Sequence, residues 1–220
     1  MTPAGLSRRR FIGAASGVAA AATLVNLGGA TAASADTHIW RSRTSKNGWP
    51  VLDDAPDHTI EGCGHEVSLA EGDAATILLH VARRFHYEID SLRAGDVHGW
   101  ISSRKVTESY ESNHLSGSAI AIRPVWYPAG TKGSLYPNEL VVVRDILAEL
   151  DGAVTWGGDL KAPKESHFEI ALPPGHPRVK GVARKIRGWN NCPAGEGAGA
   201  TDAFDPKRLE AARAFEQRAS

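Results

Sequence analysis

Two short stretches hold residues that could do chemistry, and they lie far apart in the chain. "ESNHLSGSAIAI" contains His114, and "ESHFEI" contains His167. In a strand, side chains alternate between faces, so His167 and Glu169 are expected on one face and Phe168 and Ile170 in a core. A hydrolytic zinc site needs three His, Asp or Glu ligands, an open position for water and a nearby carboxylate base. The spacing alone favours two strand histidines that are simply hydrogen-bonded.

The first 35 residues are typical of an export signal. SRRRFI, residues 7–12, fits a twin-arginine signal, and a Gly/Ala-rich run without acidic residues follows it. The run ends in an A-x-A cleavage sequence at Ala35, and its Gly, Ser and Asn residues make it a poor permanent membrane span. We therefore expect cleavage after Ala35, twin-arginine export to the cell wall or the extracellular space, and no stable membrane anchor afterwards.

The remaining residues, 36–220, are enough for one domain with a proper core. The signal holds three of the 25 basic residues and none of the 25 acidic ones, so the mature chain has 22 basic against 25 acidic residues and a formal net charge of −3. This balance does not favour nucleic acid or an anionic membrane as a partner.

The chain has two cysteines, Cys63 and Cys192. In an exported protein they are interpreted first as one long-range disulfide between the N-terminal segment and the C-terminal tail. The alternative is that Cys63, in "CGH" with His65, is a catalytic thiol. We favour the disulfide, because one nearby histidine is weak support for a nucleophile.

Periodicity predicts an α+β fold: a small central antiparallel sheet with helices packed on one side and a metal-site groove on the sheet. Residues 36–72 are turn-rich and are expected to wrap the surface with short strands, before a domain over 73–190 and a tail with a helix over 191–220. Asp73 is the expected N-cap of the first helix, and its His80 and His86 are expected at the surface or its edge. Helices are expected over 73–92, 136–152, 176–189 and 205–219, and strands over 98–103, 116–123, 153–156 and 166–172.

Three separated blocks together resemble a known family. S-x-H-x-x-G-x-A-x-D, then W-G-G-D, then a carboxylate shortly before H-F-E, is the pattern of VanY-like zinc metallopeptidases, the D-alanyl-D-alanine carboxypeptidases and L-alanyl-D-glutamate endopeptidases. The stretches "NGWPVL" and "RFHYEIDSL" also resemble the lead-in of secreted actinobacterial members. The resemblance covers roughly residues 75 to 190, with order and spacing kept. The matching residues are Ser112, His114, Gly117, Ala119, Trp156, Gly157, Gly158, Asp159, His167, Phe168 and Glu169.

The resemblance implies hydrolysis of amide bonds in peptidoglycan stem peptides. A zinc ion would polarise the carbonyl and activate a water, which a carboxylate base deprotonates. His114 and His167 carry over as zinc ligands, and residues 73–190 become the peptidase-like domain. Arg104, Ser112 and Asp159 are the candidates for substrate binding.

Two positions depart from the family pattern. The third ligand, an Asp, falls on Ala121, and the usual base position falls on Lys164. Glu165 is the nearest carboxylate and is the expected catalytic base. Position 121 should still point its Cβ into the groove, and the odd spacing from His114 requires a turn or bulge, which Ser116-Gly117 can supply. The carboxylates available to replace the missing ligand are Glu111, Asp159, Glu165 and Glu169.

Two functions from different classes therefore remain open. One is a zinc peptidase with an altered third ligand. The other is a catalytically inactive relative that binds peptidoglycan stems or another wall protein through the old substrate groove.

Overall fold

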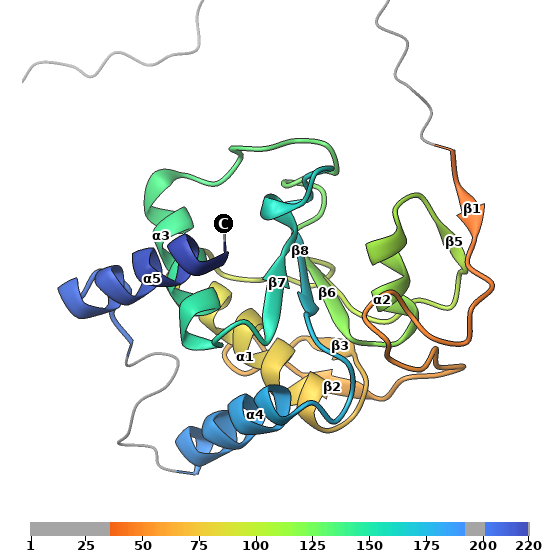
Figure 1. Ribbon diagram of the computed structural model, residues 1–220, viewed down its shortest axis with the longest axis horizontal. Coiled ribbons are helices and arrows are strands. Elements are labelled where there is room, and N and C mark those ends of the chain that lie inside the picture. Colours follow the sequence, from red (N-terminus) through yellow and green to blue (C-terminus); the bar gives the residue numbers. More distant parts are fainter. Residues whose placement is uncertain (1–35, 192–200, 220) are drawn as a thin grey trace, which may run out of the picture. The chain divides into compact units, whose positions relative to one another are not determined.

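The computed structural model describes residues 36–191 and 201–219 (Figure 1). The predicted signal, its cleavage site and Cys192 lie outside these residues. At the centre is a four-stranded sheet in the order β4-β6-β8-β7, in which every neighbouring pair is antiparallel. Its strands are β4 (Val97–His98), β6 (Ala119–Ile122), β7 (Val154–Trp156) and β8 (His167–Ile170).

The two faces of this sheet differ. Ile120 and Ile122 of β6, with Phe168 and Ile170 of β8, belong to the hydrophobic core. Their neighbours along the strands point to the opposite face, as strand alternation requires. The predicted division of the "HFEI" strand into a core face and a His167 face is confirmed.

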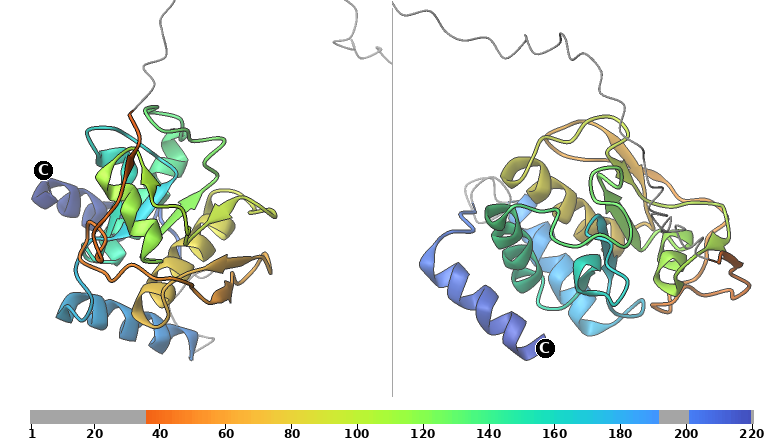
Figure 2. Two further views of the ribbon diagram at one scale, coloured as in Figure 1. Left: turned by 90° about the vertical axis from the view of Figure 1, so that its right-hand side faces the viewer. Right: turned by 90° about the horizontal axis from the view of Figure 1, so that it is seen from above.

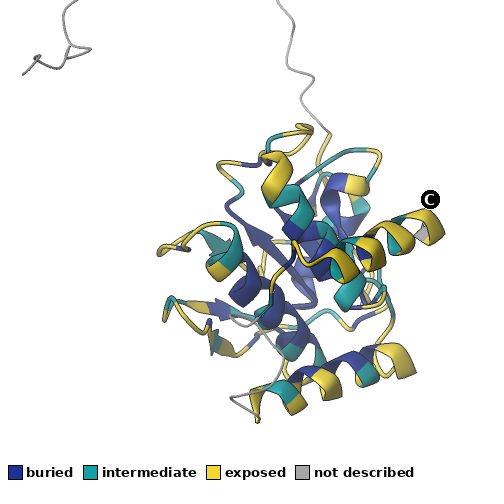
Figure 3. Ribbon diagram, turned by 90° about the vertical axis from the view of Figure 1, so that its left-hand side faces the viewer, coloured by how far each residue is buried: buried dark blue, intermediate teal, exposed yellow. Residues whose placement is uncertain are grey.

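Four helices accompany the core face, and the predicted α+β class is confirmed. Helices α1 and α3 lie against the sheet, while α4 packs along α1 and α5 packs along α3 (Figures 1 and 2). Their inward sides are buried and their outward sides exposed (Figure 3). Their bounds are α1 (Asp73–Glu88), α3 (Pro137–Glu149), α4 (Pro177–Asn190) and α5 (Pro206–Ala219).

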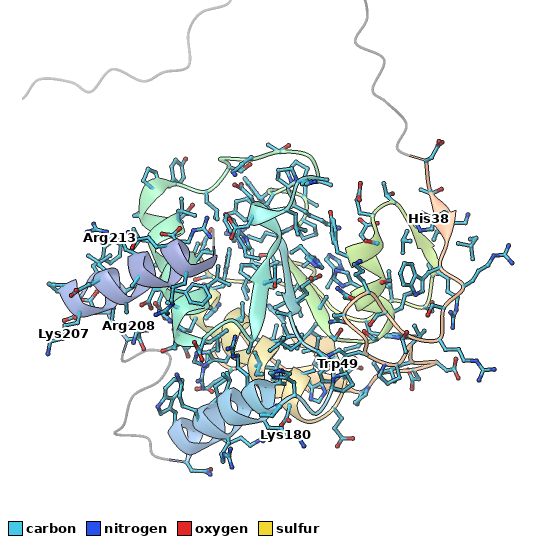
Figure 4. The ribbon with its side chains drawn as sticks, viewed as in Figure 1. His38, Trp49, Lys180, Lys207, Arg208 and Arg213 are labelled. Atoms are coloured by element: carbon cyan, nitrogen blue, oxygen red, sulfur yellow. The ribbon has the colours of Figure 1, made fainter. Side chains whose placement is uncertain are left out.

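The opposite face carries short elements. Helical turns η1 (Ser109–Glu111) and α2 (Ser112–Leu115) precede β6, and η2 (Gly157–Asp159) follows β7. Residues 36–72 do form short strands: β1 (His38–Ile39) pairs with β5 (Lys105–Val106), and β2 (Asp57–Thr59) pairs with β3 (Glu66–Ser68). The segment also contributes to the core. Trp49, labelled in Figure 4, is buried, and its ring N–H donates to the carbonyl of Leu172 at 2.8 Å.

Three local expectations were wrong. Gly72, with a φ of 87°, is the N-cap of α1, and Asp73 is the first helical residue. The strand expected over residues 98–103 ends at His98, because the chain turns away there and the N–H of Trp100 donates to the carbonyl of Ser68. His80 is buried, 2% exposed, because its ring bonds Glu149 of α3 at 2.8 Å.

The residues beyond the predicted domain are integrated with it. Arg208 of α5, labelled in Figure 4, makes two hydrogen bonds, at 2.9 and 2.7 Å, to the carboxylate of Asp145 on α3. The described part of the predicted C-terminal tail is therefore a packed helix. Within the described residues, no helix is both long enough and apolar enough to cross a membrane.

Candidate metal centre

A helical turn followed by a left-handed glycine positions His114. Helix α2 carries His114, and Gly117 then adopts a φ of 61° before β6 begins. A Cβ on Gly117 would lie 2.4 Å from the backbone nitrogen of Ala70, so glycine is required. The turn that the odd spacing between His114 and Ala121 demanded is therefore present.

The N-terminal segment fastens α2. The backbone N–H of Lys46 donates to Ser112 Oγ at 2.9 Å, and the same hydroxyl donates to the carbonyl of Ser109 at 2.7 Å. The N–H of Asn47 donates to Asn113 Oδ1 at 3.0 Å. Ser112 is buried and engaged by backbone partners, so in this structure it positions α2. Its contact with substrate stays a prediction.

The "WGGD" block supports the chain just before His167. The indole N–H of Trp156 donates to the carbonyl of Glu165 at 2.8 Å. Gly157 packs closely against this part of the chain: a Cβ on it would be 2.2 Å from the carbonyl oxygen of Lys164 and 2.9 Å from Cβ of His167. A side chain at position 157 would therefore displace the second histidine.

The two predicted ligands face each other. His114 Nε2 lies 3.2 Å from His167 Nδ1, with the ring centroids 5.2 Å apart. The outer nitrogens have acceptors of their own: His114 Nδ1 lies 2.8 Å from the carbonyl of Gly99, and His167 Nε2 lies 2.7 Å from Glu169 Oε2. Asn113 Nδ2 donates to the same Glu169 oxygen at 2.6 Å. Metal-binding histidines typically make such outer bonds to carbonyls or carboxylates.

These outer partners determine where the ring protons lie. A carbonyl or carboxylate oxygen accepts, so each neutral imidazole carries its proton on the outer nitrogen. The inner nitrogens of His114 and His167, 3.2 Å apart, are then the unprotonated ones. Two nitrogens on a tetrahedral zinc ion, each bound at about 2.0–2.1 Å, are roughly 3.3 Å apart. The pair therefore has the spacing of two metal donors.

His114 is held in the neutral form that binds metal. The residue is 5% exposed, and burial is the main cause that lowers its pKa to about 3. The charges of His167, Lys164 and His98 act in the same direction and outweigh the hydrogen bond to Gly99. Because metal ligands must be deprotonated, this environment removes a competing proton at neutral pH.

Sequence reasoning missed three contributors to this arrangement. Asn113 orients Glu169, the Gly99 carbonyl orients His114, and the Tyr110 ring packs 4.9 Å from that of His167. Burial, with nearby carboxylates, raises the pKa of Tyr110 to about 12. Asn113 stands beside His114 in the first block and could have been singled out there. Gly99 and Tyr110 come from segments that carry no motif.

Ala121, the position predicted to lack a third ligand, lies beside the two histidines. Ala121 of β6 is directly opposite His167 of β8 in the sheet, so its Cβ is on the face that carries both imidazoles. It is 5% exposed and lies outside the hydrophobic core cluster. An alanine offers no donor atom, so position 121 supplies no metal ligand.

The two candidates near the base position are engaged elsewhere. Lys164 Nζ lies 3.2 Å from Glu111 Oε1. Burial alone would raise the pKa of Glu111, but the Thr107 N–H and the Lys164 charge outweigh it and lower the pKa. Glu165 is buried, and its two carboxylate oxygens accept the N–H groups of Gly133 and Ser134 at 2.7 and 2.8 Å. In this structure Glu165 anchors a loop, and its role as base stays a prediction.

The remaining predicted residues lie in other contacts. Arg104 donates to the carbonyls of Trp40 and Ser42, and Asp159 forms a two-point ion pair with Arg144 at 2.6 and 2.8 Å. Their roles in substrate binding remain predictions. Cys63 is half-buried, and its predicted partner lies outside the described residues.

Comparisons with known proteins neither support nor oppose the family resemblance. No family model matches the chain, and no curated protein or solved structure matches it either.

Proposed function

We propose that this protein is a secreted zinc metallopeptidase of the VanY-like type that hydrolyses amide bonds in peptidoglycan stem peptides. The observation that carries the proposal is the pair of inward-facing imidazole nitrogens, 3.2 Å apart, on His114 and His167. Both rings are held by outer hydrogen bonds of the kind that metal ligands make. The order and spacing of the three sequence blocks supply the substrate class.

The residues present fit zinc in part. His114 and His167 would hold the ion, and the Gly99 carbonyl and the Glu169 carboxylate would keep the two rings aligned. The family's third donor position, Ala121, supplies no ligand atom. When bound, zinc polarises a scissile carbonyl and lowers the pKa of a water molecule. The protein's own contribution is to shield the two ring nitrogens from solvent, because both histidines are buried.

A second candidate function is binding of stem peptides without hydrolysis. It is favoured by the contacts around the base position. Lys164 is paired with Glu111, and both Glu165 oxygens are occupied by loop N–H groups. Neither residue is poised to accept a proton from water, and a lysine adds positive charge where a dication would sit.

Elemental analysis combined with a peptide assay separates the two functions. The mature protein is purified, its zinc content is measured, and synthetic stem peptides are tested for binding and for cleavage. The peptidase predicts about one zinc per chain and release of a peptide fragment, both lost in His114→Ala and retained in His38→Ala, which changes an exposed histidine on β1. Peptide binding without cleavage selects the second function. A protein that binds neither zinc nor stem peptides would contradict both functions.

A further inference from the structure

Three strands of the sheet bring a third histidine into line with the vacated position. In the register of β4 and β6, His98 lies directly opposite Ala121, and Ala121 lies directly opposite His167. Residues directly opposite each other in antiparallel strands point to the same face. His98, Ala121 and His167 therefore form one row across the sheet, with the alanine in the middle.

His98 is also close to the other predicted ligand. Its neighbour Gly99 accepts the hydrogen bond from His114 Nδ1 at 2.8 Å. The backbones of β4 and β8 are two strand spacings apart, roughly 9.5 Å. Imidazoles reaching inward from both strands flank Ala121, whose side chain is only a methyl group, and can meet at one ion bound beside it.

The His98 side chain is available for this role. It is exposed, and among the described residues it makes no hydrogen bond or ion pair. The carboxylates considered as replacements for the missing Asp are all engaged. Glu111 binds Lys164, Asp159 binds Arg144, Glu165 holds the 133–134 loop and Glu169 binds His167.

We infer that His98 is the third metal ligand of this protein, in place of the Asp that the family carries at position 121. The inference rests on the proposed zinc site. As the side chains stand, the described residues contain no group of three His, Cys, Asp or Glu that could hold a metal ion, so His98 must turn inward about its side-chain bonds. Exposed side chains change rotamer within nanoseconds, so metal binding can select the inward rotamer.

The replacement changes the chemistry of the site. Three imidazoles and a water are an established set for catalytic zinc. Three neutral imidazoles leave the full dipositive charge on the ion, whereas an Asp would cancel part of it. Compared with a site that has an Asp ligand, the ion would be a stronger Lewis acid toward a carbonyl. It would also attract an anionic ligand or a substrate carboxylate more strongly.

The test is a zinc titration of four proteins in a double-mutant cycle. These are the wild type, His98→Ala, Ala121→Asp and the double variant His98→Ala/Ala121→Asp, with His38→Ala as the matched control for loss of an exposed strand histidine. Circular dichroism and thermal unfolding establish that each variant is folded. We expect His98→Ala to weaken zinc binding at least 10-fold and His38→Ala to leave it unchanged. Because Asp at position 121 returns a donor to the same gap, Ala121→Asp should strengthen binding more in the His98→Ala background than in the wild type.

The outcomes distinguish failure of His98 as a ligand from failure of the proposed zinc site. If the wild type binds zinc and folded His98→Ala binds it equally well, His98 is not a ligand, and the proposed zinc site of His114 and His167 stands. If Ala121→Asp raises zinc affinity by the same factor in the wild type and in His98→Ala, positions 98 and 121 do not compete for the same coordination position. The inference is then overturned as well. If the wild type binds no zinc, the proposed site itself fails, whatever the variants do.

Discussion

Ala121 lies directly opposite His167 across β6 and β8, on the face of the sheet that carries the paired imidazoles. We predict that Ala121→Asp raises zinc affinity by at least an order of magnitude, because it places a carboxylate oxygen within ligand distance, about 2.0–2.2 Å, of an ion held by His114 and His167. Isothermal titration of zinc into both proteins measures the change. Equal affinities would mean that position 121 is not the vacated ligand position.

Hydrolysis should recover less than binding in that variant, because Lys164 still occupies the usual base position. Replacing it as well, in Ala121→Asp/Lys164→Asp, should increase cleavage of a stem peptide further. The new carboxylate would lie beside Glu111, and two neighbouring carboxylates raise each other's pKa, which suits a general base near neutral pH. A double variant that cleaves no faster than Ala121→Asp would show that position 164 does not face the reacting water.

Glu165 gives a second prediction, which distinguishes a base from an anchor. Its carboxylate accepts two loop N–H groups, at Gly133 and Ser134. Glu165→Gln keeps one acceptor and loses the charge, so we expect a loss of about 1–2 kcal/mol in the free energy of unfolding and faster hydrogen exchange at both amides. Unchanged stability together with lost cleavage would instead support the predicted catalytic role.

The disulfide stays a prediction, and Arg83 contacts the described residues that precede both cysteines. Its guanidinium donates to Glu61 at 2.6 Å and to Asn190 at 3.0 Å, so the residues two positions before each cysteine meet at one side chain. We predict that Cys63 and Cys192 are bridged in the exported protein, which adds about 4–5 kcal/mol of stability in the chain-entropy model. Thiol titration in denaturant without reductant should find no reactive thiol. Two reactive thiols per chain would rule the bridge out.

A buried ionic cluster between α1 and α3 predicts that acid destabilises the fold. Burial is the main cause that lowers the pKa of His80. Burial alone would raise the pKa of Glu149, but its hydrogen bond to His80 and the Arg84 charge outweigh it and bring it to about 2. Both groups therefore bind protons more tightly in the unfolded chain. Stability should fall as the pH drops below about 6.5 for His80, and again below about 4.5 for Glu149.

Urea unfolding between pH 7 and pH 4 tests this dependence. Each group contributes at most about 1.4 kcal/mol per pH unit. Buried His114, whose pKa is also lowered, contributes to the same slope, so His80→Gln should reduce the slope between pH 6.5 and pH 5 without abolishing it, and His86→Gln, which changes the other histidine of α1, is the matched control. Identical slopes for the wild type and His80→Gln would contradict the account.

The positions of the helices and of the His167 strand were predicted well, because neighbouring residues in the sequence determine them. Apolar spacing located α1. Helix α3 was expected from Pro137, which does occupy its first position, and helices were also expected where α4 and α5 lie. The alternation of "HFEI" placed His167 on the face away from the core. These features depend on residues within a few positions of one another, which a sequence displays directly.

Features set by distant partners were not predicted. His80 is buried because a carboxylate 69 positions away, on Glu149, meets it. The strand at Val97–His98 is short because the following residues turn toward the Ser68 carbonyl, which no periodicity records. His98 shows no motif at all, and only the pairing of β4 with β6 places it beside Ala121.

The central claim is that the inward nitrogens of His114 and His167 bind a metal ion. Zinc-edge X-ray absorption of the mature protein, loaded with one equivalent of zinc, tests it most directly. We predict a first shell of nitrogen and oxygen at about 2.0–2.1 Å, with the outer-shell scattering of at least two imidazole rings. That scattering should weaken in His114→Ala and in His167→Ala. A first shell of oxygen alone, with no imidazole scattering, would contradict the account.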